Sequence, residues 1–204
     1  MKKIACILLF VVMFVFLASC NSTQPVLPEN VIMPSTLTAE QQEIVDLLTI
    51  LNMQEVMIFD FHTVEAYKSL EVWVEVYENG ALVDRPAGVG THSDIAEKRN
   101  GHLAISINHN DSNYQWLLSV TENGGKSSHI GTTEAPADSE LARAFGPITE
   151  AAEIEDSKEI ILYSSIFSGN DYLVFYDGIS LQESPELIKE YPYVYLVKIR
   201  FDKL

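Results

Sequence analysis

The sequence predicts a mainly β protein: an antiparallel two-sheet β-sandwich of immunoglobulin-like character, with one N-terminal helix and short helices at its margins. The first observation behind this prediction is that apolar and polar residues alternate through about eight short segments, which is the pattern of half-buried strands. The second is that turn-forming residues separate these segments at short intervals. The third is that helical periodicity does not alternate with the strands, which argues against a parallel sheet connected by helices.

The first twenty residues predict export. Lys2 and Lys3 precede an apolar run over residues 4–17, and small residues follow just before Cys20. This is the pattern of a secretory signal peptide, and the apolar run is shorter than the roughly 20 residues that a membrane-spanning helix needs. We therefore expect a signal peptide over residues 1–19.

The end of this segment predicts lipid attachment. Residues 17–20, with the sequence LASC, resemble the lipobox of bacterial lipoproteins. The resemblance implies cleavage before Cys20 and a thiol that carries a diacylglycerol with chains such as palmitate. Since two acyl chains anchor a protein stably, we expect an extracytoplasmic protein held on the bacterial cell membrane by Cys20. The alternative is an ordinary secreted protein with a chance cysteine at its cleavage site.

Composition excludes several classes of function. The chain has 13 Lys and Arg against 29 Asp and Glu, and loss of Lys2 and Lys3 with the signal peptide takes the net charge from −16 to −18. Such a charge repels phosphate backbones, so no nucleic-acid partner is expected. The two cysteines are Cys6, inside the signal peptide, and Cys20. Neither is available for a disulfide, a zinc site or a thiol nucleophile, and no cofactor is expected.

Residues 20–37 predict a flexible linker that begins with the lipidated cysteine. Three prolines, Pro25, Pro28 and Pro34, stand there among polar and small residues without strand or helix periodicity. The remaining residues, 38–204, are expected to form a single β-rich domain.

A helix is predicted at the start of this domain. Thr38 is suited to cap it, and Gln41 follows at the spacing of a capping box. Four apolar residues then recur at helical spacing, and we expect them to pack on the sheet: Ile44, Leu47, Leu48 and Leu51.

The remaining elements follow from alternation and turn residues. Strands are predicted at residues 56–64, 70–77, 81–83, 103–107, 114–121, 129–133, 160–167, 172–176 and 191–201. Residues 84–101 predict a long polar loop, residues 138–145 a short helix, and Ser184-Pro185 the start of another.

The order of these elements resembles a known group of proteins. A capped helix followed by IFDF, WVEVYENGALV, EIILYSSIF and the closing YPYVYLVKIRF is similar to uncharacterised lipoproteins of gut-associated Gram-positive bacteria. The resemblance covers most of residues 37–204. It implies a location on the membrane and one β-rich domain, and it transfers no site residue.

One strand face carries the clearest candidate binding surface. Acidic and aromatic side chains alternate along it, at Glu71, Trp73, Glu75 and Tyr77. If this face is exposed, its rings and carboxylates suit a glycan or a partner protein, which predicts a non-enzymatic binding or envelope-architecture role. The alternative is that the rings cover a second core or form cross-strand pairs.

Two further functions remain open. His92 and Asp94 in the predicted loop, together with His102, have the residue types of a metal site, which would suit a metal-dependent extracellular hydrolase. His102 and His109 are seven positions apart on one predicted strand, so they should face opposite ways and share no ligand. The other alternative is a structural accessory subunit of a transporter or cell-wall complex. We expect no catalytic residue and no bound metal.

Overall fold

A computed structural model of the protein describes residues 29–204, except residues 53, 111, 138–139 and 170–173. The predicted signal peptide and Cys20 lie outside the described residues. Strands dominate this part of the chain, and every pairing between its named strands is antiparallel. The prediction of a mainly β, sandwich-like fold is confirmed.

The strands are β1 (Asn30–Pro34), β2 (Gln54–Glu78), β3 (Ala81–Asp84), β4 (Gly88–His109), β5 (Asn113–Glu122), β6 (Gly125–Glu134), β7 (Ala142–Pro147), β8 (Ala152–Glu153), β9 (Glu159–Ser168) and β10 (Tyr193–Asp202). The helices are α2 (Ala39–Asn52), α3 (Gly178–Glu183) and the 3-10 helix η1 (Pro185–Glu190).

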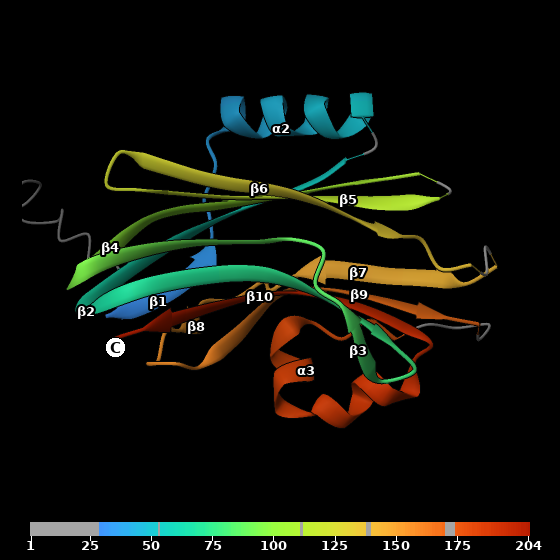
Figure 1. Cartoon of the computed structure of the whole chain (residues 1–204). Helices are drawn as coiled ribbons and strands as arrows, with labels where there is room; N and C mark the ends of the chain where they lie inside the picture. The colour runs from blue at the N-terminus through green and yellow to red at the C-terminus, as the bar shows by residue number, and fades with distance from the viewer. Residues whose placement is uncertain (1–28, 53, 111, 138–139, 170–173) are drawn as a thin grey trace, which may run out of the picture.

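Two long strands join the two layers of the sandwich. The first half of β2 lies between β1 and the second half of β4, which continues into β5 and β6. The second half of β2 lies between the first half of β4 and β10, which continues into β9 and β7. Figure 1 shows β5 and β6 in the upper layer and β10, β9 and β7 in the lower layer. The sandwich is therefore one sheet folded over rather than two separate sheets.

The fold occurs at irregularities in the pairing of β2 with β4. The register shifts between His62 and Ala66 and again between Tyr67 and Ser69. Extra residues in one strand bend it and increase its twist, so these bulges carry both strands from the upper layer to the lower one.

The main core lies between the layers. Its aromatic residues connect the inner faces: the ring centroids of Trp116 on β5 and Tyr195 on β10 are 5.9 Å apart, and those of Phe61 on β2 and Phe201 on β10 are 5.7 Å apart. A second, smaller core lies on the outer face of the lower layer, between that layer and helices α3 and η1. Figure 1 shows α3 on this outer face. Its buried residues are Ile161, Ile166, Leu181, Ile188, Val194 and Leu196. The helix predicted at Ser184-Pro185 is confirmed, because η1 begins with Pro185.

The boundary of the predicted linker is wrong. Residues 30–34 form β1, which pairs with both β2 and β8, and Val31 and Ile32 are fully buried. The prolines of this segment argued against a strand in the sequence. Pro34 has no backbone N–H to donate, but it is the last residue of β1, so the pairing of the residues before it is kept. The folded domain therefore includes residue 30.

Helix α2 begins as predicted but is placed differently. Thr38 and Gln41 form the capping box: the Gln41 backbone N–H donates to Thr38 Oγ1 over 3.2 Å, and the Thr38 N–H donates to Gln41 Oε1 over 2.9 Å. Ile44 and Leu47 remain 59% and 53% exposed, so the prediction that they pack on the sheet is wrong. Val45 lies closer to the sheet and lines a gap of about 190 Å³ above β2. The side chains of Leu48 and Leu51 lie outside the described residues.

Three further predictions are corrected. Residues 88–101 belong to β4 rather than to a loop, and residues 142–147 form β7 rather than a helix, because they pair with β9. Of the strand predicted at 172–176, residues 174–176 are irregular and the others lie outside the described residues. Among the described helices, none is both long and apolar enough to cross a membrane.

Candidate functional site

The predicted acidic and aromatic row is largely buried, so it is not an exposed binding surface. Trp73 is 6% exposed and Glu75 is 2% exposed, while Glu71 is open to solvent. Tyr77 packs against the second core, as the alternative interpretation expected. The proposal of a stacking surface formed by Glu71, Trp73, Glu75 and Tyr77 is therefore wrong, because residues far along the chain cover it.

Glu75 is the centre of a buried network of hydrogen bonds. Its Oε1 accepts from Trp73 Nε1 over 2.9 Å and from Arg85 Nη2 over 2.6 Å. Its Oε2 accepts from the Tyr77 hydroxyl over 2.6 Å and lies 2.7 Å from Lys198 Nζ. Burial alone would raise the pKa of the Glu75 carboxyl, but these donors outweigh it and lower that pKa to about 2. The carboxylate is saturated with donors, which suits a structural role.

The stability of the protein is expected to fall in acid because of Glu75. The pKa of the Glu75 carboxyl is lower in the folded protein than its ordinary 4.5, so its ionised form stabilises the fold fully above about pH 5. This stabilisation is lost as the pH falls through 4.5 towards 2. The expected loss is about 3 kcal/mol in the free energy of unfolding. Urea unfolding at a series of pH values measures it. Over the same pH range, the free energy of unfolding of the Glu75→Gln variant should fall less than that of the parent, by this same amount. An unchanged pH dependence in this variant would contradict the assignment.

The residues proposed for a metal site are not brought together. His92 pairs with Ser69 in the sheet, whereas His102 pairs with Asp60, and Asp94 lies in the bulge beside His92. His102 Nδ1 lies 2.6 Å from Asp60 Oδ1, which also accepts from the Ser35 hydroxyl over 2.7 Å. Within the described residues, no group of three or more His, Cys, Asp or Glu side chains is arranged to hold a metal ion. The hydrolase hypothesis therefore loses the site on which it depended.

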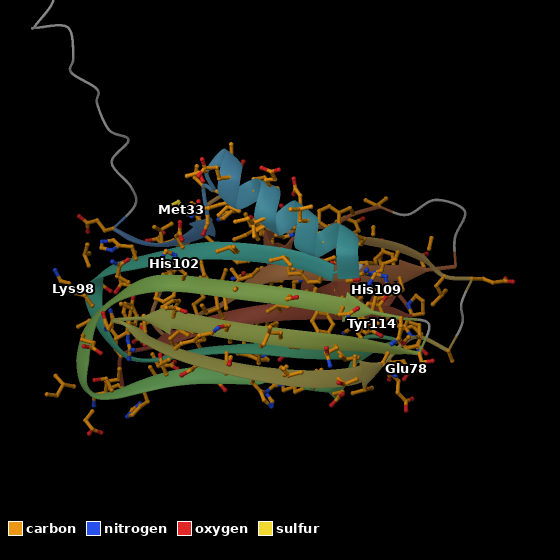
Figure 2. All side chains as sticks on the ribbon, turned by 90° about the horizontal axis from the view of Figure 1, so that it is seen from above. Met33, Glu78, Lys98, His102, His109 and Tyr114 are labelled. Carbon is orange, nitrogen blue, oxygen red and sulfur yellow. The ribbon has the colours of Figure 1, made fainter. Side chains whose placement is uncertain are left out.

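The two strand histidines lie at opposite ends of the molecule. Figure 2 shows His102 on the side of Met33 and Lys98, and His109 beside Tyr114 at the far end. His102 is exposed on the outer face, whereas the ring of His109 stacks on Tyr114 with centroids 5.4 Å apart. At this separation the two side chains cannot hold one ligand together.

The far end of the sandwich gathers an unusual number of aromatic and titratable side chains. We call it the tyrosine-rich end and define it by Glu55, Glu78, His109, Tyr114, Arg143, Phe145, Tyr163, Phe167, Tyr193 and Tyr195. They come from the start of β2 and from β4 and β5 in the upper layer, and from the end of β2 and from β7, β9 and β10 in the lower layer. Antiparallel pairing places the starts of β5 and β10 beside the ends of β4 and β9, so these side chains meet.

Arg143 links the two layers at this end. Its Nη1 donates to Glu55 Oε1 over 2.7 Å, its Nη2 to the Tyr163 hydroxyl over 2.6 Å, and its Nε to the Ser165 hydroxyl over 2.7 Å. The guanidinium carbon also lies 4.1 Å from the ring centroid of Phe145. Glu55 and Arg143 are 16% and 12% exposed, so the pair is shielded but reaches the surface.

Some polar groups near this end have no hydrogen-bond partner among the described residues. They are Trp116 Nε1 and His109 Nδ1, both buried atoms. The Tyr114 ring lies between them, stacked on His109 and 6.2 Å from Trp116. Burial, with Glu55 nearby, raises the pKa of Tyr163 well above its ordinary value, so its hydroxyl stays protonated. Since a buried polar group without a partner is costly, a water molecule beside these atoms would be stabilised.

A pocket elsewhere on the molecule offers less chemistry. An open pocket of about 400 Å³ lies between β8, β9 and α3, and its charged lining residues are Glu153, Glu155, Lys158 and Glu183. It contains no aromatic side chain, and Lys158 is already paired with Glu155. The tyrosine-rich end is therefore the stronger candidate site.

Sequence analysis missed the tyrosine-rich end for two reasons. Arg143 was assigned to a helix, and Glu55 lies 88 positions from it in the chain. A usable signal was present: Tyr114 begins a predicted strand, Tyr193 is near the start of another, and Phe167 ends a third. In an antiparallel sheet the start of one strand meets the end of its neighbour, which would have grouped these rings.

Comparisons with known proteins identify the family but no specific relative. No curated protein and no solved structure matches the chain. A family model described as the YgaN domain matches residues 31–201, from the second residue of β1 to the penultimate residue of β10. Because this match spans nearly all of the folded domain, the chain belongs to the YgaN domain family.

Proposed function

We propose that this protein is a lipid-anchored, extracytoplasmic binding protein that is not an enzyme and holds a glycan or a partner protein at its tyrosine-rich end. The lipobox-like sequence before Cys20 supports the location. The single observation that carries the binding role is the exposed Phe145 ring, whose centroid lies 4.1 Å from the guanidinium carbon of Arg143, the residue that joins the two layers through Glu55.

The chemistry of this end suits recognition better than catalysis. Arginine and aromatic side chains are the groups that most often dominate binding energy, and rings also stack on sugars. Glu55 is held by Arg143 and by the Tyr163 hydroxyl, 2.7 Å from each, so it is not free to act as a base. Phe145 is 47% exposed and lies against Arg143, which gives an incoming ligand an apolar contact beside a cation.

Phe145 provides the most direct test. Replacing it by the photo-crosslinking residue p-benzoylphenylalanine should capture the ligand in native membranes, because the ring borders the proposed site. Phe175 is the matched control: it is 41% exposed and lies over Gly146, on the opposite face of β7. We expect a defined adduct, resolved by mass spectrometry, from position 145 and none from position 175.

The same pair of positions tests affinity. On a glycan array, or with the captured partner, Phe145→Ala should weaken binding by about tenfold, as expected when a contact worth roughly 1.4 kcal/mol is lost. Phe175→Ala should bind as the parent does. Equal behaviour of the two variants, or equal adducts from both positions, would contradict the proposal.

An accessory role in a larger complex is the second candidate. The observation that favours it is the exposure of Ile44 and Leu47 on α2, since an amphipathic helix normally buries its apolar side chains. In that case crosslinks to a protein should arise from α2 rather than from position 145.

A further inference from the structure

We infer that the domain rests on the lipid bilayer through the end at which its tether enters, with Ile95 and Val64 at the membrane interface. This inference depends on the lipid anchor proposed above. We call this surface the tethered end and define it by Val64, Lys68, Ile95 and Lys98, which lie in or beside the two bulges of the β2–β4 pairing.

The chain enters the fold at these bulges. Asn30, the first residue of β1, pairs with Thr63, and its side-chain oxygen accepts from the backbone N–H groups of Val64 and Glu65 over 3.0 and 3.1 Å. The entry point is therefore fixed to the bend of β2. In Figure 2, Lys98 marks this end of the molecule.

The entry point and the length of the tether favour contact of this end with the bilayer. Ten residue steps separate Cys20 from Asn30, and ten steps of extended chain reach at most about 36 Å. Strand β5, with 10 residues, runs from the tyrosine-rich end to the tethered end, which puts about 30 Å between them. A short tether attached at one end of an elongated domain favours contact of that end with the membrane and points the tyrosine-rich end away from it.

The side chains of the tethered end suit such contact. Ile95 is 77% exposed and Val64 is 37% exposed, and both belong to bulges that protrude from the sheet. Lys98 pairs with Ala66 beside these bulges and Lys68 lies within the second one. Long basic side chains there can place their charge among headgroups while their methylene groups remain in the interface.

Local charge does not oppose this placement, although the mature chain carries a net charge of −18. Glu65 is neutralised by Lys203, whose Nζ lies 2.7 Å away. The other charges of residues 63–68 and 93–98 are two lysines and two carboxylates, Lys68, Lys98, Asp94 and Glu97, and Glu29 adds a third carboxylate beside Val64, whose backbone N–H donates to the Glu29 carbonyl. The tethered end thus carries only a small excess of negative charge on a strongly acidic protein. Because the anchor already holds the domain at the bilayer, even a weak contact would be well populated.

Site-specific labelling of the full lipidated protein tests the inference. The acylated Cys20 offers no free thiol, so a cysteine at one other position can be labelled alone with the fluorophore NBD. We choose Ile95→Cys and, as the matched control, Val83→Cys on β3, which is 54% exposed and lies next to the tyrosine-rich end of β2. The protein is reconstituted in vesicles of phosphatidylethanolamine and phosphatidylglycerol.

The expected result is a blue-shifted emission at position 95 and a several-fold lower quenching by aqueous iodide than at position 83. In detergent-free buffer, with an unlipidated chain that starts at residue 20 and carries Cys20→Ala, both labels should be equally accessible. Equal quenching of both labels in the lipidated protein would overturn the inference about orientation. Incorporation of palmitate that depends on Cys20 checks the anchor separately, and its absence would overturn the anchor itself.

Discussion

Replacing Glu75 by alanine is expected to lower the free energy of unfolding by about 3 kcal/mol. The carboxylate is 2% exposed and is the shared acceptor for Trp73, Tyr77 and Arg85, with Lys198 as its second cationic partner. Its removal leaves buried donors without an acceptor, and hydrogen bonds to a charged group are the strong ones. Lys198 keeps its contact with Glu159 at 2.9 Å, which limits the loss. Urea unfolding followed by tryptophan fluorescence and circular dichroism measures it.

Glu71 provides the matched control for this variant. It lies on the same face of β2, four residues earlier, but it is 53% exposed and its pair with Arg200 spans 3.2 Å. Exposed ion pairs contribute at most about 1 kcal/mol, so Glu71→Ala should be nearly silent. Glu75→Gln should fall between the two, because the amide preserves shape and one acceptor. Equal losses from Glu71→Ala and Glu75→Ala would contradict a structural role for the buried network.

The two faces of the second half of β2 show what local sequence can predict. Alternation correctly assigned Val72, Val74 and Val76 to the main core, where they are 0%, 0% and 4% exposed. The same pattern placed Trp73 and Glu75 on the other face, and this was also right. That face is covered by Lys198 and by helices α3 and η1, which lie more than a hundred positions further along the chain. Periodicity specifies which side chains share a face but not what packs on it.

The missed strands have a different cause. The first half of β4 carries mostly polar residues and is largely exposed, so it lacks the alternation by which strands are recognised. It is a strand because β2 supplies a long partner for its backbone, from Ser69 to Trp73. Strand β7 is similar: its six residues gain their pairing from β9, which is almost completely buried. In both cases a tertiary partner decides the structure, as is usual for strands.

The candidate site was the least accessible to prediction. Its aromatic members were visible as strand ends, but the ion pair that organises them joins Glu55 on β2 to Arg143 on β7. Neither strand pairs with the other; they meet only because the sheet folds over at the β2–β4 bulges. The bend itself depends on two register shifts in the β2–β4 pairing, and no local sequence motif predicts them.

Replacing Arg99 by methionine is expected to be the most damaging single change, with a loss of about 4 kcal/mol in the free energy of unfolding. Arg99 is 1% exposed and lies at the bend, where its Nε donates to the Tyr67 carbonyl over 3.3 Å and its Nη2 donates to the Lys68 carbonyl. Its Nη1 lies 2.5 Å from Glu122 Oε1 on β5. The variant would free two buried carbonyls and leave the Glu122 carboxylate, 9% exposed, without its cation.

Two further variants separate the charge effect from the loss of packing. In Arg99→Met with Glu122→Gln, no unpaired charge remains, so a substantial part of the lost stability should return. Lys158→Met, which removes an exposed pair with Glu155, should leave the urea midpoint unchanged. If the double variant is no more stable than Arg99→Met alone, the buried charge of Glu122 is not the cause. The carbonyls of the bend would then account for the loss, and Arg99 would act mainly as the side chain that fixes the bulges in which the tether is held.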